Sequence, residues 1–224
     1  MNNLVVINEN ETTKTKFLGS IETRGVSMKK LKILIASTLV PPSQGGAEKV
    51  AWQTAEQLAA SKKNEVHVFT TTKNYKKYPG IKVHTVPKVP LLTIFYSTIG
   101  WPFIKKILSK HKFDIIHSHM SLPWGFVFRN CKAKKIITMH GCEYLNKSFL
   151  YNLFAKAAYK KTDSKVSPSK WMRHYVKKHY GYDSQVINNG IDTSKYKILK
   201  NSQFSIKKTC LFYGRISLIM LNRT

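Results

Sequence analysis

Acidic residues and arginine are both scarce in this sequence. Its 224 residues contain 11 Asp and Glu against 38 Lys and Arg, a formal net charge of +27, and only five of the basic residues are Arg. Because base readout and bidentate phosphate binding favour Arg, this composition argues against sequence-specific nucleic-acid recognition. An excess of Lys suits diffuse attraction to anionic lipid, acidic sugars or nucleic acid without sequence preference. A solvated lysine surface, or biased codon usage without any anionic partner, is the alternative.

Cysteine is also rare, and long apolar runs are missing. Cys131, Cys142 and Cys210 form no C-x-x-C pair and are odd in number, which argues against a disulfide scaffold and favours a reducing compartment. The longest apolar run, residues 91–104, is interrupted by Gly100 and Pro102 and is too short to span a membrane. We therefore expect a cytoplasmic protein, with peripheral contact at the inner membrane surface as an option.

The first 27 residues show neither a helical nor a strand period. Residues 8–16 read NENETTKTK, and the apolar cluster at residues 4–7 is too short for the core of a signal peptide. We expect residues 1–27 to be a disordered extension, dispensable or wrongly assigned, with a natural start at Met28.

From Leu31 onward, buried strands alternate with amphipathic helices. We expect helices around Val50, Thr54 and Leu58 and over residues 94–110, 148–161 and 169–179. This order predicts an α/β fold, a Rossmann-like parallel sheet with helices on both faces, whose ligands lie beyond the carboxyl ends of the strands. The expected strands are residues 31–37, 65–71, 81–86, 113–118, 135–140, 164–167 and 184–188.

A loop with paired glycines follows the first expected strand. Residues 41–48 read PPSQGGAE and lead into the first helix. Gly45 and Gly46 lack Cβ atoms, so their backbone N–H groups can approach an anion, and the helix points its positive end at the same place. The sequence therefore predicts a phosphate-binding loop. It lacks the full G-x-G-x-x-G pattern, however, and a plain strand-to-helix turn would have the same sequence.

Histidines stand at the ends of two further strands. His117 and His119 form an H-x-H pair, and His140 leads the sequence HGCE. Two imidazoles on one strand face suit a metal if His140 or Glu143 is a third ligand, but no second tight ligand pair exists, so we expect strand-capping histidines and no metal. Cys142 beside His140 could be a nucleophile, yet nothing in the sequence orients the base, and a buried thiol is the simpler interpretation.

Five short motifs then follow one another along the chain: PSQGGAE at 42–48, DIIHSH at 114–119, TMHG at 138–141, SPS at 167–169 and VINNGID at 186–192. In this order they resemble retaining glycosyltransferases of the two-domain GT-B type, similar to glycosyltransferase family 4 (group 1). The resemblance covers about residues 28–217. Each motif is loose, but five in the correct order make chance agreement a poor explanation.

The resemblance implies transfer of a sugar from a nucleotide-diphosphate donor to a glycan or lipid acceptor, without a further cofactor. It implies that the amides of Gly45 and Gly46 approach the donor diphosphate and that His140, the catalytic residue, lies beside the reacting sugar. The other implied positions are acceptor or cleft-lining residues (His117, His119, Glu143, Ser167 and Ser169), a hinge (Asn189, Gly190 and Asp192) and a second diphosphate-binding residue (Arg215).

The same resemblance divides the chain into an acceptor-side domain, residues 28–190, and the hinge and first strand of a donor-binding domain, residues 191–224. In the family, an Arg at the position of Arg215 and a Lys soon after it clamp the diphosphate. Here neither a Lys nor a Glu pair at the family's E-x7-E spacing follows Arg215. We therefore expect a truncated chain that is inactive alone. The alternative is a natural half-enzyme that pairs with a separate donor-domain subunit.

A second function class also fits the sequence: a non-catalytic module that binds anionic membrane or polysaccharide surfaces. Residues 91–106 combine bulky apolar side chains with lysines, and residues 170–180 form a basic, aromatic helix. Core helices with a solvated lysine face have the same pattern, and we favour that interpretation.

Overall fold

The computed structural model describes residues 30–43, 45–141 and 148–190. Over these residues strands and helices alternate, which confirms the predicted Rossmann-like α/β fold. The strands are β1 (Leu31–Ala36), β2 (Asn64–Thr70), β3 (Ile81–Thr85), β4 (Ile115–His119), β5 (Lys134–Thr138), β6 (Ser164–Ser167) and β7 (Gln185–Val186).

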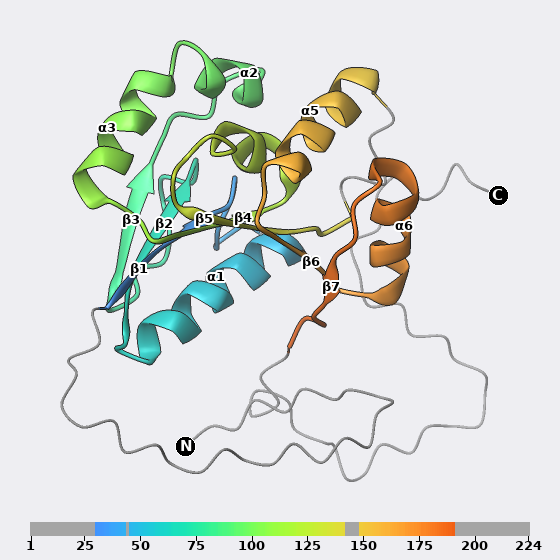
Figure 1. Ribbon diagram of the computed structural model, residues 1–224. Helices are drawn as coiled ribbons and strands as arrows, with labels where there is room; N and C mark the ends of the chain where they lie inside the picture. Colours follow the sequence, from blue (N-terminus) through green and yellow to red (C-terminus); the bar gives the residue numbers. More distant parts are fainter. Residues whose placement is uncertain (1–29, 44, 142–147, 191–224) are drawn as a thin grey trace, which may run out of the picture. The chain divides into compact units, whose positions relative to one another are not determined.

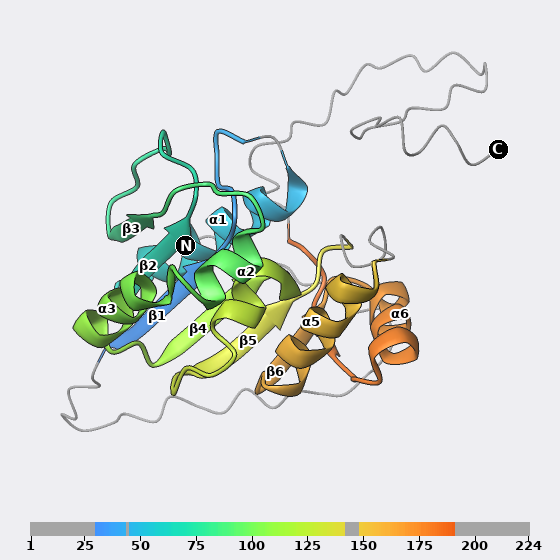
Figure 2. The same ribbon diagram turned by 90° about the horizontal axis from the view of Figure 1, so that it is seen from above.

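All seven strands form one parallel sheet in the order β3-β2-β1-β4-β5-β6-β7. The chain builds outward from β1 to β3, returns to place β4 on the other side of β1, and then continues outward to β6 (Figure 2). β7 is the edge strand next to β6. The strand order therefore reverses between β1 and β4. In open parallel sheets, ligands bind at such a reversal, outside the carboxyl ends of the strands.

Helices cover both faces of the sheet, as the sequence predicts. Figure 1 shows α1 on one face and α2, α3 and α5 on the other, with α6 beside β6 and β7. A short segment, η1, lies on the α2–α3 side and packs against α5. The helical segments are α1 (Gly46–Ala60), α2 (Leu92–Ser97), α3 (Trp101–His111), η1 (Ser121–Gly125), α5 (Phe149–Lys160) and α6 (Lys170–Tyr180).

Neighbouring residues of the central strand β1 belong to different cores. Leu34 packs with Phe69 and Trp124 on the face covered by α3, whereas Ile35 packs with Trp52 of α1. Leu34 and Ile35 are both fully buried. Since successive side chains of a strand point to opposite faces, a strand covered on both sides must be apolar throughout, which explains the apolar run that the sequence shows here.

The single helix expected over residues 94–110 is wrong, because the structure divides this segment into α2 and α3. Pro102 lies in the first turn of α3, where its missing N–H removes no helical hydrogen bond. Gly100 precedes α3, and a Cβ there would lie only 2.6 Å from Cδ1 of Tyr96. The close approach of Tyr96 thus requires glycine at the turn between the two helices.

The expected N-terminal extension, residues 1–27, and the expected start of a second domain, residues 191–224, lie outside the described residues. None of the described helices is both long and apolar enough to cross a membrane.

Candidate functional site

The candidate site lies at the reversal of strand order, where β1 and β4 end side by side. Gly45 and Gly46 follow β1, and His119 is the last residue of β4. Ile35, which packs against α1, pairs with His117 in the register of β1 and β4. His117 and His119 therefore belong to the sheet face that α1 covers.

The paired glycines form the start of α1. Gly45 is the residue before the helix, in extended conformation, and its carbonyl accepts a hydrogen bond from the N–H of Lys49 at 3.2 Å. A Cβ at residue 45 would collide with the carboxylate of Glu48, whereas a Cβ at residue 46 would meet nothing within 4 Å. The protein's own packing therefore does not require glycine at position 46, and an anion can approach the helix on this side.

Glu48 supplies a negative charge in the first turn of α1. A carboxylate is stabilised there by the partial positive charge of the helix N-terminus. Because this carboxylate lies against Gly45, a bound diphosphate would have to approach through Gly46 or displace Glu48. Of the two glycines in the predicted phosphate-binding loop, only Gly46 is thus open to an approaching anion.

Three histidines form a row at the same edge of the sheet. Nδ1 of His119 lies 2.9 Å from Nε2 of His140, and the two rings stack with centroids 5.1 Å apart. On the other side, the ring of His117 stacks on His119 at 4.5 Å, and its Nε2 lies 2.8 Å from Oγ1 of Thr138. The structure therefore brings the histidines of β4 and the end of β5 together, as predicted, and adds Thr138, which sequence reasoning missed.

Burial keeps these imidazoles neutral. It lowers the pKa of His140 from 6.5 to about 4, and burial together with the nearby His140 lowers the pKa of His117 to about 4. The pKa of His119 lies well below 6.5 because of burial first, then His117 and His140. A neutral imidazole donates one hydrogen bond and accepts another. At neutral pH the row therefore suits binding of a sugar hydroxyl better than donation of a proton from imidazolium.

One fully buried nitrogen of the row lacks a hydrogen-bond partner among the described residues. His119 is 2% exposed, and its Nε2 makes no hydrogen bond within the part of the chain that the structure describes. Leaving a buried polar group unpaired costs about 1–3 kcal/mol, so a ligand or water bonded to this nitrogen would lower the free energy.

Two unusual backbone conformations fix the ends of the strands that carry these histidines. Met120 follows His119 with a φ of 86°, and its N–H donates to the carbonyl of Thr138 at 2.8 Å. Gly141 follows His140 with a φ of 95°. A positive φ is unfavourable for a residue such as Met and is held here by the surrounding structure. The chain turns sharply after each histidine, at the same edge of the sheet.

Two predicted cleft residues, Ser167 and Ser169, have structural hydrogen bonds. Ser167 is fully buried at the end of β6, and its hydroxyl lies 2.7 Å from the hydroxyl of Ser184. Ser169 caps α6 by accepting a hydrogen bond from the N–H of Met172 at 3.2 Å. These bonds account for both serines without a ligand, and their place in a cleft stays a prediction.

Several predicted residues cannot be placed. Glu143, Asp192 and Arg215 lie outside the described residues, as does Cys142. Asn189 and Gly190 are exposed at the end of the last described segment, following β7. The predicted hinge and the second diphosphate-binding residue therefore stay predictions.

A second histidine group was not predicted from the sequence. His67, His84 and His111 meet on the α3 side of the sheet, and their potential ligand atoms lie within 4.8 Å of one another. They are far apart in the sequence and belong to three different elements, so no local spacing links them. Only the pairing of β2 with β3 and the packing of α3 bring them together.

Comparison with known protein families gives one match. The family profile described as Glycosyltransferase Family 4 matches residues 44–195. Among curated protein sequences, none gives a significant match.

Two solved structures are similar in fold. A sucrose-phosphate synthase from Thermosynechococcus elongatus matches with a TM-score of 0.56 at 19% identity, over 71% of this chain and 47% of that one. A glycosyltransferase from Rickettsia africae matches with a TM-score of 0.51 at 15% identity, over 71% of this chain and 42% of that one. The chain thus spans less than half of either protein. Because the family profile matches more than half of the chain, the chain belongs to glycosyltransferase family 4.

Proposed function

We propose that this chain forms the acceptor side of a glycosyltransferase active site that passes a sugar from a nucleotide-diphosphate donor to a glycan or lipid acceptor. The observation that carries the proposal is the presence of two features at the edge of the sheet where the strand order reverses. These are an open glycine at the start of α1 and a hydrogen-bonded pair of neutral histidines, His119 and His140. Membership of family 4 supports the reaction class.

Each residue of the site has its own role in this proposal. The amide of Gly46 approaches the donor diphosphate, which the helix N-terminus attracts. His140 bonds a hydroxyl of the reacting sugar, while His119 fixes the position of the His140 ring by their 2.9 Å hydrogen bond. The groups named here are neutral, so the charge of the leaving diphosphate requires cations from elsewhere. Arg215, outside the described residues, is our candidate.

NMR of the histidine rings tests this assignment. The chain is titrated with a panel of nucleotide-diphosphate sugars and, separately, with the free nucleoside diphosphates. We expect donor-dependent shifts of the His119 and His140 ring signals, with His174 on the exposed side of α6 as an unaffected internal control. The G46A variant should weaken the effect. Shifts that are absent for every donor, or equally large at His174, would contradict the proposal.

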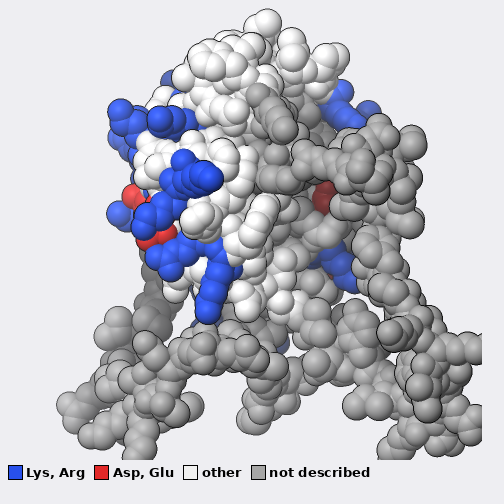
Figure 3. Space-filling model, turned by 90° about the vertical axis from the view of Figure 1, so that its right-hand side faces the viewer, with Lys and Arg blue, Asp and Glu red and all other residues white. Residues whose placement is uncertain are grey.

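Peripheral membrane contact is a second candidate role that the surface favours. Leu91 and Ile99 at the ends of α2 are 75% and 79% exposed, and Phe103 of α3 is half-exposed beside the exposed Lys105 and Lys106. Apolar side chains next to lysines suit insertion into an anionic lipid surface. Basic side chains also gather on the α6 side of the molecule, with few acidic ones among them (Figure 3).

Liposome flotation separates insertion at α2–α3 from diffuse attraction. The K105Q/K106Q variant is compared with K177Q/K178Q, a matched pair of exposed lysines on α6. If α3 contacts the membrane, the first pair should reduce flotation with anionic vesicles markedly more than the second. Equal losses would show that only net charge matters, and equal flotation with neutral vesicles would argue against an electrostatic contact.

A further inference from the structure

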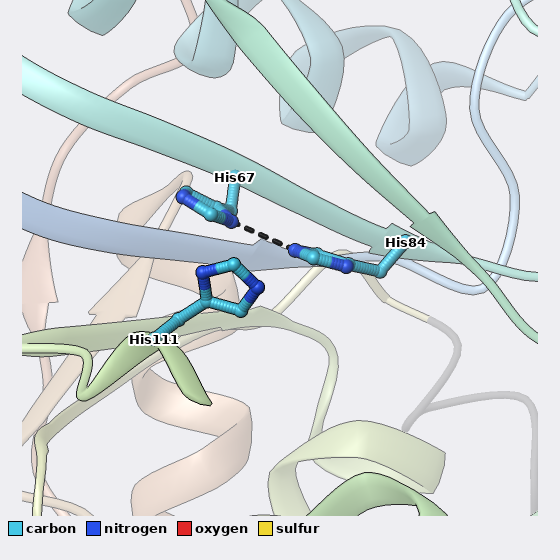
Figure 4. A group of neighbouring side chains, drawn as sticks. All are labelled: His67, His84 and His111. Carbon is cyan, nitrogen blue, oxygen red and sulfur yellow. Dashed lines mark hydrogen bonds between the residues drawn. The ribbon is translucent and has the colours of Figure 1, made fainter. Parts of the chain in front are cut away.

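Three histidines from different elements meet between the sheet and the end of α3 (Figure 4). His67 belongs to β2, His84 to β3, and His111 is the last residue of α3. Nδ1 of His67 lies 2.7 Å from Nε2 of His84, and the ring of His111 lies 4.6 Å from the His67 ring and 5.0 Å from the His84 ring, centroid to centroid. Each imidazole therefore touches the other two.

A carboxylate fixes the orientation of the buried member. Nε2–H of His67 donates a hydrogen bond to Oε1 of Glu65 at 3.0 Å. With the proton held at Nε2, the lone pair of His67 is at Nδ1 and faces His84, whose Nε2–H donates to it. Metal-binding histidines commonly donate their second N–H to a carboxylate, which sets the ring orientation and raises the basicity of the ligand nitrogen. Glu65 provides this arrangement before any metal is present.

The spacing and ligand type suit a tetrahedral ion. Nitrogens bound to Zn²⁺ at about 2.0–2.1 Å are about 3.4 Å apart in a tetrahedron. Here the ligand atoms lie between 2.7 Å and 4.8 Å from one another, so small movements of the two half-buried rings reach that geometry. On metal binding His84 carries its proton on Nδ1 in place of Nε2, which leaves the Nε2 lone pair for the ion. We propose that His67, His84 and His111 bind a Zn²⁺ ion that ties α3 to strands β2 and β3, with water as the fourth ligand.

The protonation of the cluster supports this assignment. Burial lowers the pKa of all three histidines, for His84 to about 4, so the neutral form that binds metals prevails at neutral pH. The charged groups that act on the cluster are Glu65, which favours a cation, and three lysines, which oppose it: Lys32, Lys82 and Lys110. Lys32 and Lys82 are themselves paired with Glu65, at 3.6 Å and 2.7 Å.

This site is separate from the proposed active site. Leu34 of β1 pairs with both His67 and Ile116, so His67 shares the sheet face of Leu34 and Ile116, the one that α3 covers. His117 follows Ile116 and therefore points to the opposite face. Zinc at the cluster would stabilise the domain without entering the sugar-transfer site, so the inference does not depend on the proposed function.

Calorimetry and thermal unfolding of the full chain test the proposal. After metal removal with a chelator, the chain is titrated with ZnCl₂ and, in parallel, with MgCl₂. We expect one Zn²⁺ per chain at high affinity and a rise in Tm of about 5–10 °C when free Zn²⁺ is about a hundred times Kd. Mg²⁺, which prefers oxygen ligands, should have no effect.

Single-residue variants test which side chains bind the ion. H111Q and H84Q remove ligands that are only half-buried and should each weaken Zn²⁺ binding by more than about tenfold. E65Q keeps all three ligands and should weaken Zn²⁺ binding by about 10–100-fold, because the ring of His67 loses its carboxylate partner. H174Q, an exposed histidine of α6, is the matched control and should bind like the parent chain. The proposal is overturned if the parent chain binds no Zn²⁺, or if H111Q binds it with unchanged affinity, because other residues then hold the ion.

Discussion

His119 and His140 are joined by a 2.9 Å hydrogen bond between Nδ1 and Nε2, although 21 positions separate them in the sequence. The bond links the ends of β4 and β5 at the edge where parallel-sheet proteins bind ligands. Among the described residues, neither ring has a charged partner, and each is held in place by the other. The pair can therefore be tested through its effect on pH-dependent stability.

We expect stability to fall as the pH drops from about 6.5 toward 4. The pKa of His117 and of His140 is about 4 in the folded protein, against 6.5 for an unperturbed histidine, and that of His119 is also lowered. In this pH window the unfolded chain binds more protons than the folded chain, so the free energy of unfolding decreases by up to about 1.4 kcal/mol per pH unit for each such histidine.

Urea unfolding at pH values from 7.5 to 4.5 measures this slope. H140Q should show a shallower slope than the parent chain, whereas H174Q should not. A stability that stays constant between pH 7.5 and 5 would show that these imidazoles are not held neutral by the fold.

Replacing Gly45 and Gly46 by alanine should change the free energy of unfolding in opposite directions. G46A places a methyl group where nothing lies within 4 Å and should raise the free energy of unfolding by up to about 1 kcal/mol. G45A should lower it by about 0.5–1 kcal/mol, because the methyl group displaces Glu48 and alanine is a poor N-cap residue. If G46A nevertheless weakens donor binding, glycine is needed there for the ligand. Unchanged binding would remove Gly46 from the proposed site.

The hydroxyls of Ser167 and Ser184 should behave as a coupled pair. S167A leaves the buried hydroxyl of Ser184 without its 2.7 Å partner and should cost about 1–3 kcal/mol of stability. The double variant S167A/S184A should cost less than the sum of the two single variants, since no unpaired group remains. A thermal or urea unfolding cycle gives this coupling energy. Additive losses would argue that Ser167 has another partner.

Gly125 packs closely against Ile137 of β5, so replacing it by alanine should destabilise the protein. A Cβ at residue 125 would lie 2.9 Å from Cδ1 of Ile137 and 3.1 Å from the carbonyl oxygen of Met120. G125A should therefore lower the free energy of unfolding by about 1–3 kcal/mol. I137V removes the Cδ1 atom and should recover part of that loss in the double variant, although alone it costs about 0.5–1.5 kcal/mol. Strictly additive effects would contradict the contact.

Some features of the fold and of the site follow from local patterns in the sequence. The apolar run of β1 predicts a strand buried on both faces, and the period that follows Gly46 predicts α1, because both depend on nearby residues. The division of residues 94–110 at Gly100 was missed, although Pro102 signals it, because the apolar spacing continues across the turn.

The ligand-binding edge was predicted by a general rule. Parallel strands end at the same edge, so polar residues that end the strands, such as His119 and His140, lie along one edge of the sheet. That these two histidines touch depends on the pairing of β4 with β5. The partners of these residues were not predictable. Whether Ser167 faces a ligand or Ser184 depends on the pairing of β6 with β7, which joins segments distant in the chain.

The sequence by itself determined the alternation of strands and helices, the glycines at the start of α1 and the histidines at the ends of two strands. Each of these features depends only on a short stretch of residues. Only the tertiary structure decided that His119 bonds His140, and that His67, His84 and His111 form one cluster. These relationships depend on strand register and on the docking of helices, which are set by contacts between residues far apart in the chain.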